Sequence, residues 1–189
     1  KSKAAEYRSI RAPLPTGYAA QEWCPFGLGR IAPDGAYDQR EDDRNSLCSD
    51  LPPLKQPLRI AGFAWAKLRI KADKPQALVS ARLTDVAPDG TSTLISFGML
   101  NLAHRKGHEN PKPLRPGQFY DVAVELKPVA QIIAKDHVLR LAVSSAYWPM
   151  IWPSPELVTL TLEPASCSLS LPILASGFRS RTVSFAKAV

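Results

Sequence analysis

The chain has 189 residues, of which 45% are hydrophobic and 22% charged, as in a globular domain with a sizeable core. Its net charge of +7 comes from lysines and arginines scattered along the chain, not clustered with aromatic residues on one element, which argues against nucleic-acid binding. It contains no apolar run of the roughly 18 residues that a membrane-spanning helix needs, so no membrane partner is expected.

Three cysteines, Cys24, Cys48 and Cys167, have no C-x-x-C spacing and do not make an even number. Free thiols in a reducing cytosol are therefore expected, although a Cys24–Cys48 bridge stays open. The first residues lack the apolar core of a signal peptide, which favours a cytoplasmic location. The chain does not begin with Met, so a signal upstream of it also stays open.

Residues 1–57 show weak periodicity, with seven prolines and a charged run at residues 38–44. A loop this long is uncommon in a compact domain unless it is functional or packs on a partner. The composition therefore predicts a long extended segment that wraps over the domain or over a neighbour.

From Leu58 onward apolar and polar residues alternate, which is the period-two pattern of strands. In residues 66–72 the lysines and arginine between apolar residues predict one solvent-facing side. Pro88-Asp89-Gly90 predicts a turn, because proline presets φ and glycine accepts a positive φ. The expected strands are residues 58–62, 66–72, 79–84, 95–99, 120–126, 139–143, 158–162 and 167–171.

Residues 129–134 give the only helical pattern, of one or two turns. Many short strands between Gly- and Pro-containing turns predict an all-β sandwich. The long connection from Asn101 to Gln118 favours a jelly roll, with a galactose-binding-domain-like arrangement. The expected division is an extended segment over residues 1–57, a sandwich over residues 58–175 and a tail over residues 176–189.

The sequence carries no recognisable catalytic constellation. It lacks the G-x-S-x-G elbow of a serine hydrolase, and Ser144-Ser145 falls within a predicted strand. His104 and His108 lie in a loop rich in Gly, Asn and Pro, so we expect loop histidines and not a metal site completed by Glu109. His137 precedes a strand and is expected to pack or cap there. No catalytic, cofactor-binding or metal-binding residue is therefore predicted.

The acidic residues between Asp38 and Asp43 lack the spacing of a calcium loop. Interleaved with Arg40 and Arg44, they predict a charged surface run that is available for ion pairs with a neighbouring domain.

Tyr147, Trp148 and Trp152 lie among several prolines. Exposed rings could stack on a sugar, whereas buried rings would seal one end of the sandwich or face another domain. The second interpretation is favoured, and carbohydrate binding is kept as the alternative.

A series of segments between Tyr37 and Leu171 stands in a specific order and spacing: Asp38-Gln39-Arg40 with Asp43 and Ser46-Leu47, Leu58 to Gly62, Arg82 to Gly90, Gly98 to Arg105, Leu114-Arg115-Pro116-Gly117 and Leu139 to Pro149. This pattern, which covers about 70% of the chain, resembles the C-terminal domain of the cocaine esterase and X-Pro dipeptidyl-peptidase group of serine hydrolases. At Asp136-His137 that family usually has Gly-His, but Asp tolerates the left-handed conformation better than most residues, so the turn can persist.

The resemblance implies an α/β-hydrolase catalytic domain, with a Ser-His-Asp triad and a helical cap, upstream in the same polypeptide. The jelly roll of such proteins packs against both and helps to wall the active-site cleft. The triad is not in this chain, so the resemblance transfers no catalytic residue. Similarity to galactose-binding sandwiches does not by itself imply sugar binding.

We therefore expect an accessory domain of an esterase or dipeptidyl-peptidase. A self-contained enzyme built on His104 or His137 is a third interpretation. The substrate of the parent and homo-oligomerisation stay open. The expected interface or substrate-wall residues are Asp38, Gln39, Arg40, Asp43, Arg44, His104, Arg105, Tyr147, Trp148 and Trp152.

Overall fold

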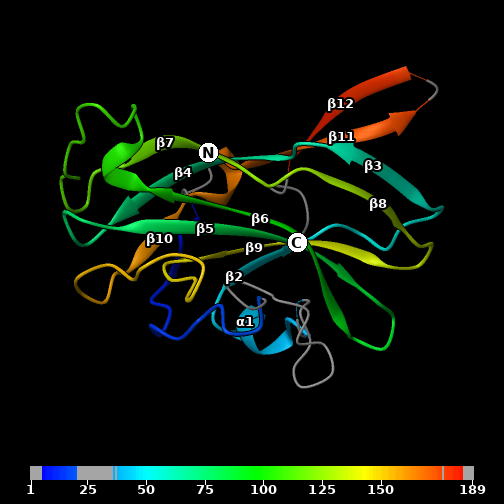
Figure 1. The fold of residues 1–189 in the computed structure, drawn as a ribbon, viewed down its shortest axis with the longest axis horizontal. Coiled ribbons are helices and arrows are strands. Elements are labelled where there is room, and N and C mark those ends of the chain that lie inside the picture. Colours follow the sequence, from blue (N-terminus) through cyan, green and yellow to red (C-terminus); the bar gives the residue numbers. More distant parts are fainter. Residues whose placement is uncertain (1–5, 21–35, 37, 176, 185–189) are drawn as a thin grey trace, which may run out of the picture.

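The computed structural model describes residues 6–20, 36, 38–175 and 177–184, and Figure 1 shows their arrangement. These residues form two antiparallel sheets of eight and four strands. The predicted all-β sandwich is confirmed. The short helices are α1 (Arg40–Arg44), η1 (Leu102–His104) and η2 (Pro164–Ser166).

The larger sheet contains β1 (Arg8–Ile10), β3 (Leu58–Gly62), β4 (Trp65–Ala72), β7 (Tyr120–Glu125), β8 (Val129–Ile133), β10 (Leu160–Leu162), β11 (Ser168–Ala175) and β12 (Gly177–Ser184). The smaller sheet contains β2 (Leu47–Asp50), β5 (Leu78–Val86), β6 (Ser92–Asn101) and β9 (Val138–Ser144).

The hydrophobic core lies between the two sheets. It includes Leu68 and Ile70 of β4 and Leu169 of β11 from the larger sheet, and Leu83 of β5 and Leu141 of β9 from the smaller one. Side chains alternate between the two faces of a strand, so each strand sends every second residue into this layer. The alternation predicted for β4 is confirmed.

The chain alternates between the sheets as it proceeds, so that β1–β10–β4–β7 are neighbours in one sheet and β2–β9–β5–β6 in the other. This order is compatible with the expected jelly roll. The finer likeness to galactose-binding domains stays a prediction.

The helix expected at residues 129–134 is wrong, because this segment is strand β8. It pairs with β3 in the register Leu58↔Ile133 to Gly62↔Val129. A helix of one or two turns is marginal on its own, and here the open edge of β3 satisfies the same backbone groups.

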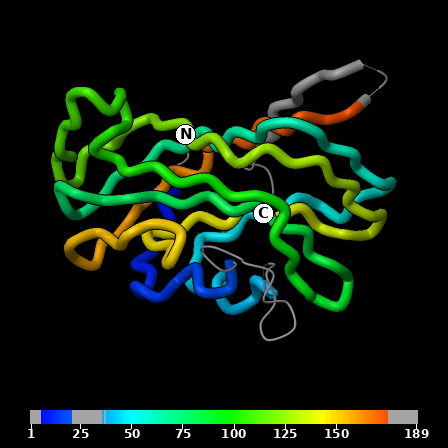
Figure 2. The backbone as a smooth tube through the Cα atoms, in the orientation of Figure 1, coloured from blue at the N-terminus to red at the C-terminus, as the bar shows by residue number. Residues whose placement is uncertain are grey.

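The ends of the chain contain more regular structure than the sequence suggested. Residues 1–57, expected to be an extended segment, contribute β1 to the larger sheet, β2 to the smaller sheet, and α1 between them. Beyond residue 175, expected to be a tail, β12 pairs with β11. Figure 2 shows residues 12–20 running close to α1 and to the loop that follows β9.

Two turns behave as their residue types predict. Gly90 has a φ of 86°, and its amide donates to the Ala87 carbonyl at 2.8 Å. Asp136 has a φ of 67°, the left-handed conformation expected for the residue before His137.

Candidate functional site

A buried charged residue lies at the centre of β5. Arg82 is fully buried, and its guanidinium donates from Nη1 to Gln39 Oε1 at 2.9 Å and from Nη2 to Ser46 Oγ at 2.8 Å. The same Nη2 lies 3.2 Å from Asp43 Oδ1. Because an unpaired buried charge is strongly unfavourable, these contacts determine how α1 and its neighbours are held against β5.

A second arginine extends this network towards the surface. Arg140 of β9 contacts Asp50 of β2 through Nε at 2.7 Å and Nη2 at 2.8 Å, and Asp43 through Nη1 at 3.1 Å. Asp50 and Arg140 are also direct partners in the β2–β9 ladder. Hydrogen bonds to Asp50 and Asp43 raise the pKa of Arg140, so this cation stays charged.

Asp42, beside Asp43 in α1, binds backbone amides. The Asp42 carboxylate, which is 1% exposed, accepts from the Gly17 amide at 2.8 Å and from the Ala19 amide at 3.1 Å. Gln39 Nε2 donates to the Ala19 carbonyl at 2.5 Å. Residues 12–20 are therefore attached to α1 by side chain–backbone hydrogen bonds.

The expectation of a surface charged run is thus wrong for Gln39, Asp42 and Asp43, which are buried. Arg82 and Arg140, which bind Gln39 and Asp43, lie on strands distant in sequence, and no local pattern could indicate them. Asp38 lies nearer the surface, where a hydrogen bond from Arg40 lowers the pKa of its carboxyl.

Arg40 and Arg44 are exposed, as expected. Glu41 is exposed as well, so Arg40, Glu41 and Arg44 remain available for contact with another molecule.

The aromatic cluster is divided between core and surface. Tyr147 is fully buried, lies beneath the Arg82 guanidinium and contacts Phe97 at 5.2 Å between ring centroids. Trp148 and Trp152 are 38% and 79% exposed. Their ring centroids are 5.2 Å apart and their planes are inclined by 57°, so they do not form a flat platform.

The three histidines take part in two separate side-chain contacts. His104 and His108 approach each other with their Nδ1 atoms 3.2 Å apart, and His137 Nδ1 lies 2.7 Å from Asp85 Oδ1. Arg105, beside His104, donates to backbone carbonyls of its own loop and lies over the ring of Tyr120.

Within the described ranges, no group of three or more His, Cys, Asp or Glu side chains is arranged to hold a metal ion. In the same described ranges the ring of His104 bonds to that of His108 and the ring of His137 bonds to Asp85, so neither of these bonds reaches a serine. No helix of the described part is long and apolar enough to span a membrane.

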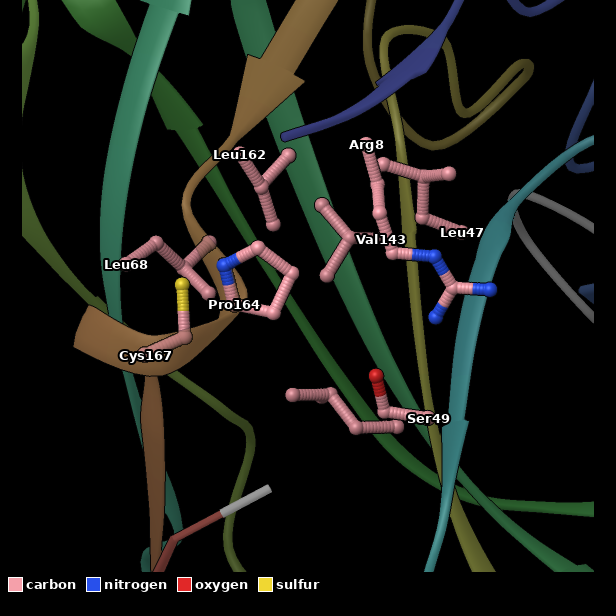
Figure 3. Close-up of a pocket in the computed structure, with 9 residues that line it drawn as sticks. Arg8, Leu47, Ser49, Leu68, Val143, Leu162, Pro164 and Cys167 are labelled. Atoms are coloured by element: carbon pink, nitrogen blue, oxygen red, sulfur yellow. The ribbon is translucent and has the colours of Figure 1, made fainter. Parts of the chain in front are cut away.

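A small apolar hollow lies between the edges of the two sheets (Figure 3). Its lining includes Leu47 and Val143 from the smaller sheet, Leu162 from the larger sheet, and Pro164 and Cys167 beside it. Its volume of about 20 Å³ has room for roughly one water molecule, so it cannot hold a substrate.

Cys48 and Cys167 are free thiols. Burial raises the pKa of both, that of Cys48 to about 11. Cys24 lies outside the described residues.

Comparisons with known proteins identify the family to which this fold belongs. The family model described as the X-Pro dipeptidyl-peptidase C-terminal non-catalytic domain matches residues 3–181. The cocaine esterase of a Rhodococcus species is 27% identical over 118 residues, which cover 61% of this chain and 21% of that protein. The chain thus spans about a fifth of this relative.

Two solved structures share the fold. An aminopeptidase from a marine sediment Thaumarchaeota archaeon aligns with a TM-score of 0.75 and 18% identity, covering 92% of this chain and 34% of that one. An α-amino acid ester hydrolase aligns with a TM-score of 0.73 and 21% identity, covering 92% and 33%. In both, the matching region is part of a larger hydrolase chain. The chain therefore belongs to the family of X-Pro dipeptidyl-peptidase C-terminal non-catalytic domains.

Proposed function

We propose that this domain packs on the catalytic domain of a serine hydrolase and helps to wall its active site. The parent enzyme would cleave esters or amides through an acyl-enzyme, as the esterase and aminopeptidase relatives suggest. The catalytic serine, histidine and aspartate would be supplied by the rest of the parent polypeptide.

The observation that carries the packing role is the exposure of the Trp148–Trp152 pair. Trp152 is 79% exposed, although a large aromatic side chain contributes to stability or binding mainly when it is buried in a core or an interface. Exposed aromatic clusters mark interaction surfaces more often than scattered single residues do. The pair therefore suits a surface that another domain covers.

Of the other residues expected at the interface, Asp38, Arg40, Arg44, His104 and Arg105 are accessible or partly accessible. We assign them to direct contact with the catalytic domain. Gln39, Asp43 and Tyr147 are buried against the outer face of the smaller sheet, around Arg82, so they support the surface from beneath.

The geometry favours this role over carbohydrate binding. A sugar-binding platform needs exposed and nearly coplanar rings, whereas Trp148 and Trp152 are inclined by 57° and Tyr147 is buried. Titration of the isolated chain with soluble oligosaccharides is expected to leave its tryptophan fluorescence unchanged. A saturable change would favour the carbohydrate-binding alternative.

The experiment that tests the proposal compares this chain with the longer hydrolase that contains it. A p-nitrophenyl ester and an Xaa-Pro p-nitroanilide are the substrates, and we expect turnover by the longer protein alone. Trp152→Ala in the longer protein is expected to raise KM and lower Tm. The matched control Ile132→Ala removes a side chain of β8 that is 60% exposed and should change neither.

Turnover by the isolated chain would contradict the proposal. If that activity disappeared on substitution of His104 or His137, it would establish the self-contained enzyme instead.

A further inference from the structure

Residues 12–20, here called the strap, are fixed to the domain from two sides. On one side, Asp42 of α1 accepts the Gly17 and Ala19 amides. On the other side, the Ala12 amide donates to Ser145 Oγ at 3.1 Å, and the Trp148 amide donates to the Thr16 carbonyl at 2.8 Å. The strap thus bridges α1 and the loop that carries Trp148.

Gly17 allows the close approach on the second side. Its φ is +110°, and a Cβ built on it would lie 2.7 Å from the Trp148 carbonyl oxygen and 2.8 Å from the Tyr147 backbone. Both the backbone conformation and the lack of space require glycine at this position. The strap and the Trp148 loop are therefore packed backbone to backbone.

The strap buries its small residues and exposes its large ones. Ala12, Ala19 and Ala20 are at most 1% exposed, whereas Leu14 and Tyr18 are 44% and 57% exposed. A series of turns holds these two residues, with hydrogen bonds from Thr16 to Pro13 and from Tyr18 to Pro15. An ordered segment that presents its largest apolar side chains outward is pre-organised for a partner.

We infer that the strap and the Trp148–Trp152 loop form one docking surface, occupied by the catalytic domain of the longer hydrolase. This inference rests on the proposed function and extends it to a second segment, with Leu14 and Tyr18 as contact residues and Asp42 as a positioning residue. Tyr18 also has an interaction within this chain, so its contact with the partner would be additional.

Two observations favour this occupant. The aligned region is about a third of the solved hydrolase chains, at 34% and 33%, so most of such a polypeptide is available as an intramolecular partner. Exposed Arg11, beside the strap, and exposed Arg44 of α1 belong to the same segments. A partner with an acidic rim around an apolar centre would complement them.

Hydrogen exchange tests the inference directly. The exchange of residues 12–20 and 145–152 is measured in this chain alone and in the longer hydrolase. We expect both segments to exchange about tenfold more slowly in the longer protein, since docking suppresses local opening. Leu14→Ala with Tyr18→Ala should remove the added protection and lower the Tm of the longer protein by about 2–4 °C, and leave the Tm of this chain unchanged.

Phe63→Ala is the matched control, because Phe63 is 52% exposed between β3 and β4. It should leave the exchange of both segments unaltered. Asp42→Asn should reduce the protection of the strap and raise KM of the longer hydrolase more than it lowers kcat, which a purely structural role would not produce.

The outcomes separate this inference from the proposed function. Added protection of residues 145–152 without protection of the strap would overturn the inference and leave the proposed function standing. Absence of added protection in both segments would overturn both.

Discussion

Arg82 Nη2 lies 3.2 Å from Asp43 Oδ1, and the two side chains are 0% and 4% exposed. Asp43 Oδ2 accepts from Ser92 Oγ at 2.8 Å and from Arg140 Nη1 at 3.1 Å. One buried carboxylate therefore links α1 to β5, β6 and β9. The smaller sheet is held to the N-terminal segments by charge as well as by apolar packing.

Removing Arg82 is expected to destabilise the domain strongly. Arg82→Met would remove the contacts of the guanidinium with Gln39 Oε1 and Asp43 Oδ1 in a site closed to water. Breaking a buried ion pair by removing one partner costs about 3–5 kcal/mol. Urea denaturation of the wild type and the variant measures the difference in the free energy of unfolding.

Arg69→Met is the matched control for this prediction. Arg69 pairs with Asp121 and Glu163 on the surface, and its side chain is 38% exposed. Solvent screening makes such pairs weak, so its unfolding midpoint should stay near that of the wild type. Equal destabilisation by both variants would show that the buried Arg82 contacts contribute no more to stability than the exposed Arg69 pairs.

Gly98 of β6 is expected to tolerate no side chain. A Cβ at this position would overlap the backbone carbonyl of Glu125. The contact is tight because the neighbouring Ser96 Oγ and Phe97 carbonyl both bond to the Lys127 backbone, at 2.6 and 2.9 Å. Gly98→Ala should lower the free energy of unfolding by about 1–3 kcal/mol or more, measured by urea denaturation.

Gly90→Ala provides the comparison for Gly98. Gly90 has a φ of +86° but open space around its Cα, so alanine there would clash with nothing and would only have to adopt a left-handed backbone conformation. That conformation is unfavourable for alanine by about 1–2 kcal/mol. A Gly98→Ala variant as stable as the wild type would show that β6 and the end of β7 can move apart without any decrease in the free energy of unfolding.

The left-handed residue before His137 gives a further prediction. Asp136 has a φ of 67° and an exposed side chain. Asp136→Gly removes the strain of the left-handed backbone conformation but raises the conformational entropy of the unfolded chain. These two effects on the free energy of unfolding nearly cancel. Asp136→Ala keeps the strain and loses the polar group that eases it, and should be less stable by about 0.5–1 kcal/mol.

Thermal unfolding of the two Asp136 variants and the wild type gives their order of stability. Greater stability of the alanine variant than of the glycine variant would contradict the assignment of the turn.

The strands were predictable where their alternation is local. Leu68 and Ile70 face the core and Lys67 faces solvent, which the sequence shows directly. β5 breaks this rule, because Ser80, Arg82 and Thr84 on its other face are also buried. The segments that cover them, α1 and the strap, come from residues that lack periodicity and could not be placed by pattern.

The buried part of the charged run illustrates the same limit. Asp42 and Asp43 resemble surface residues by composition, and their burial depends on Gly17, Arg82 and Arg140, which are far away in sequence. Trp148 and Tyr147 are adjacent in sequence but differ in exposure, because the chain turns at this point. Motif order identified the family, whereas these tertiary pairings required the structure.

Stability is expected to fall in alkaline solution. Burial, with help from the Asp43 carboxylate, raises the pKa of the Cys48 thiol from 9.0 to about 11. Between these values the unfolded chain releases a proton that the folded chain keeps, so the free energy of unfolding falls as pH rises. Below about pH 8 Cys48 is protonated in both states and the domain keeps its full stability. As pH rises from about 8 to beyond 11, the ionisation of Cys48 lowers the free energy of unfolding by roughly 2–3 kcal/mol.

Urea denaturation at pH 7, 8, 9 and 10.5 measures this dependence. Burial also raises the pKa of Cys167 and Tyr147, so these groups add to the decline in the same direction. Cys48→Ala removes one contribution and should therefore show a shallower decline than the wild type above pH 9. An equal slope in both proteins, or rapid reaction of Cys48 with a thiol reagent at pH 8, would show that this thiol is not protected by its burial against Asp43.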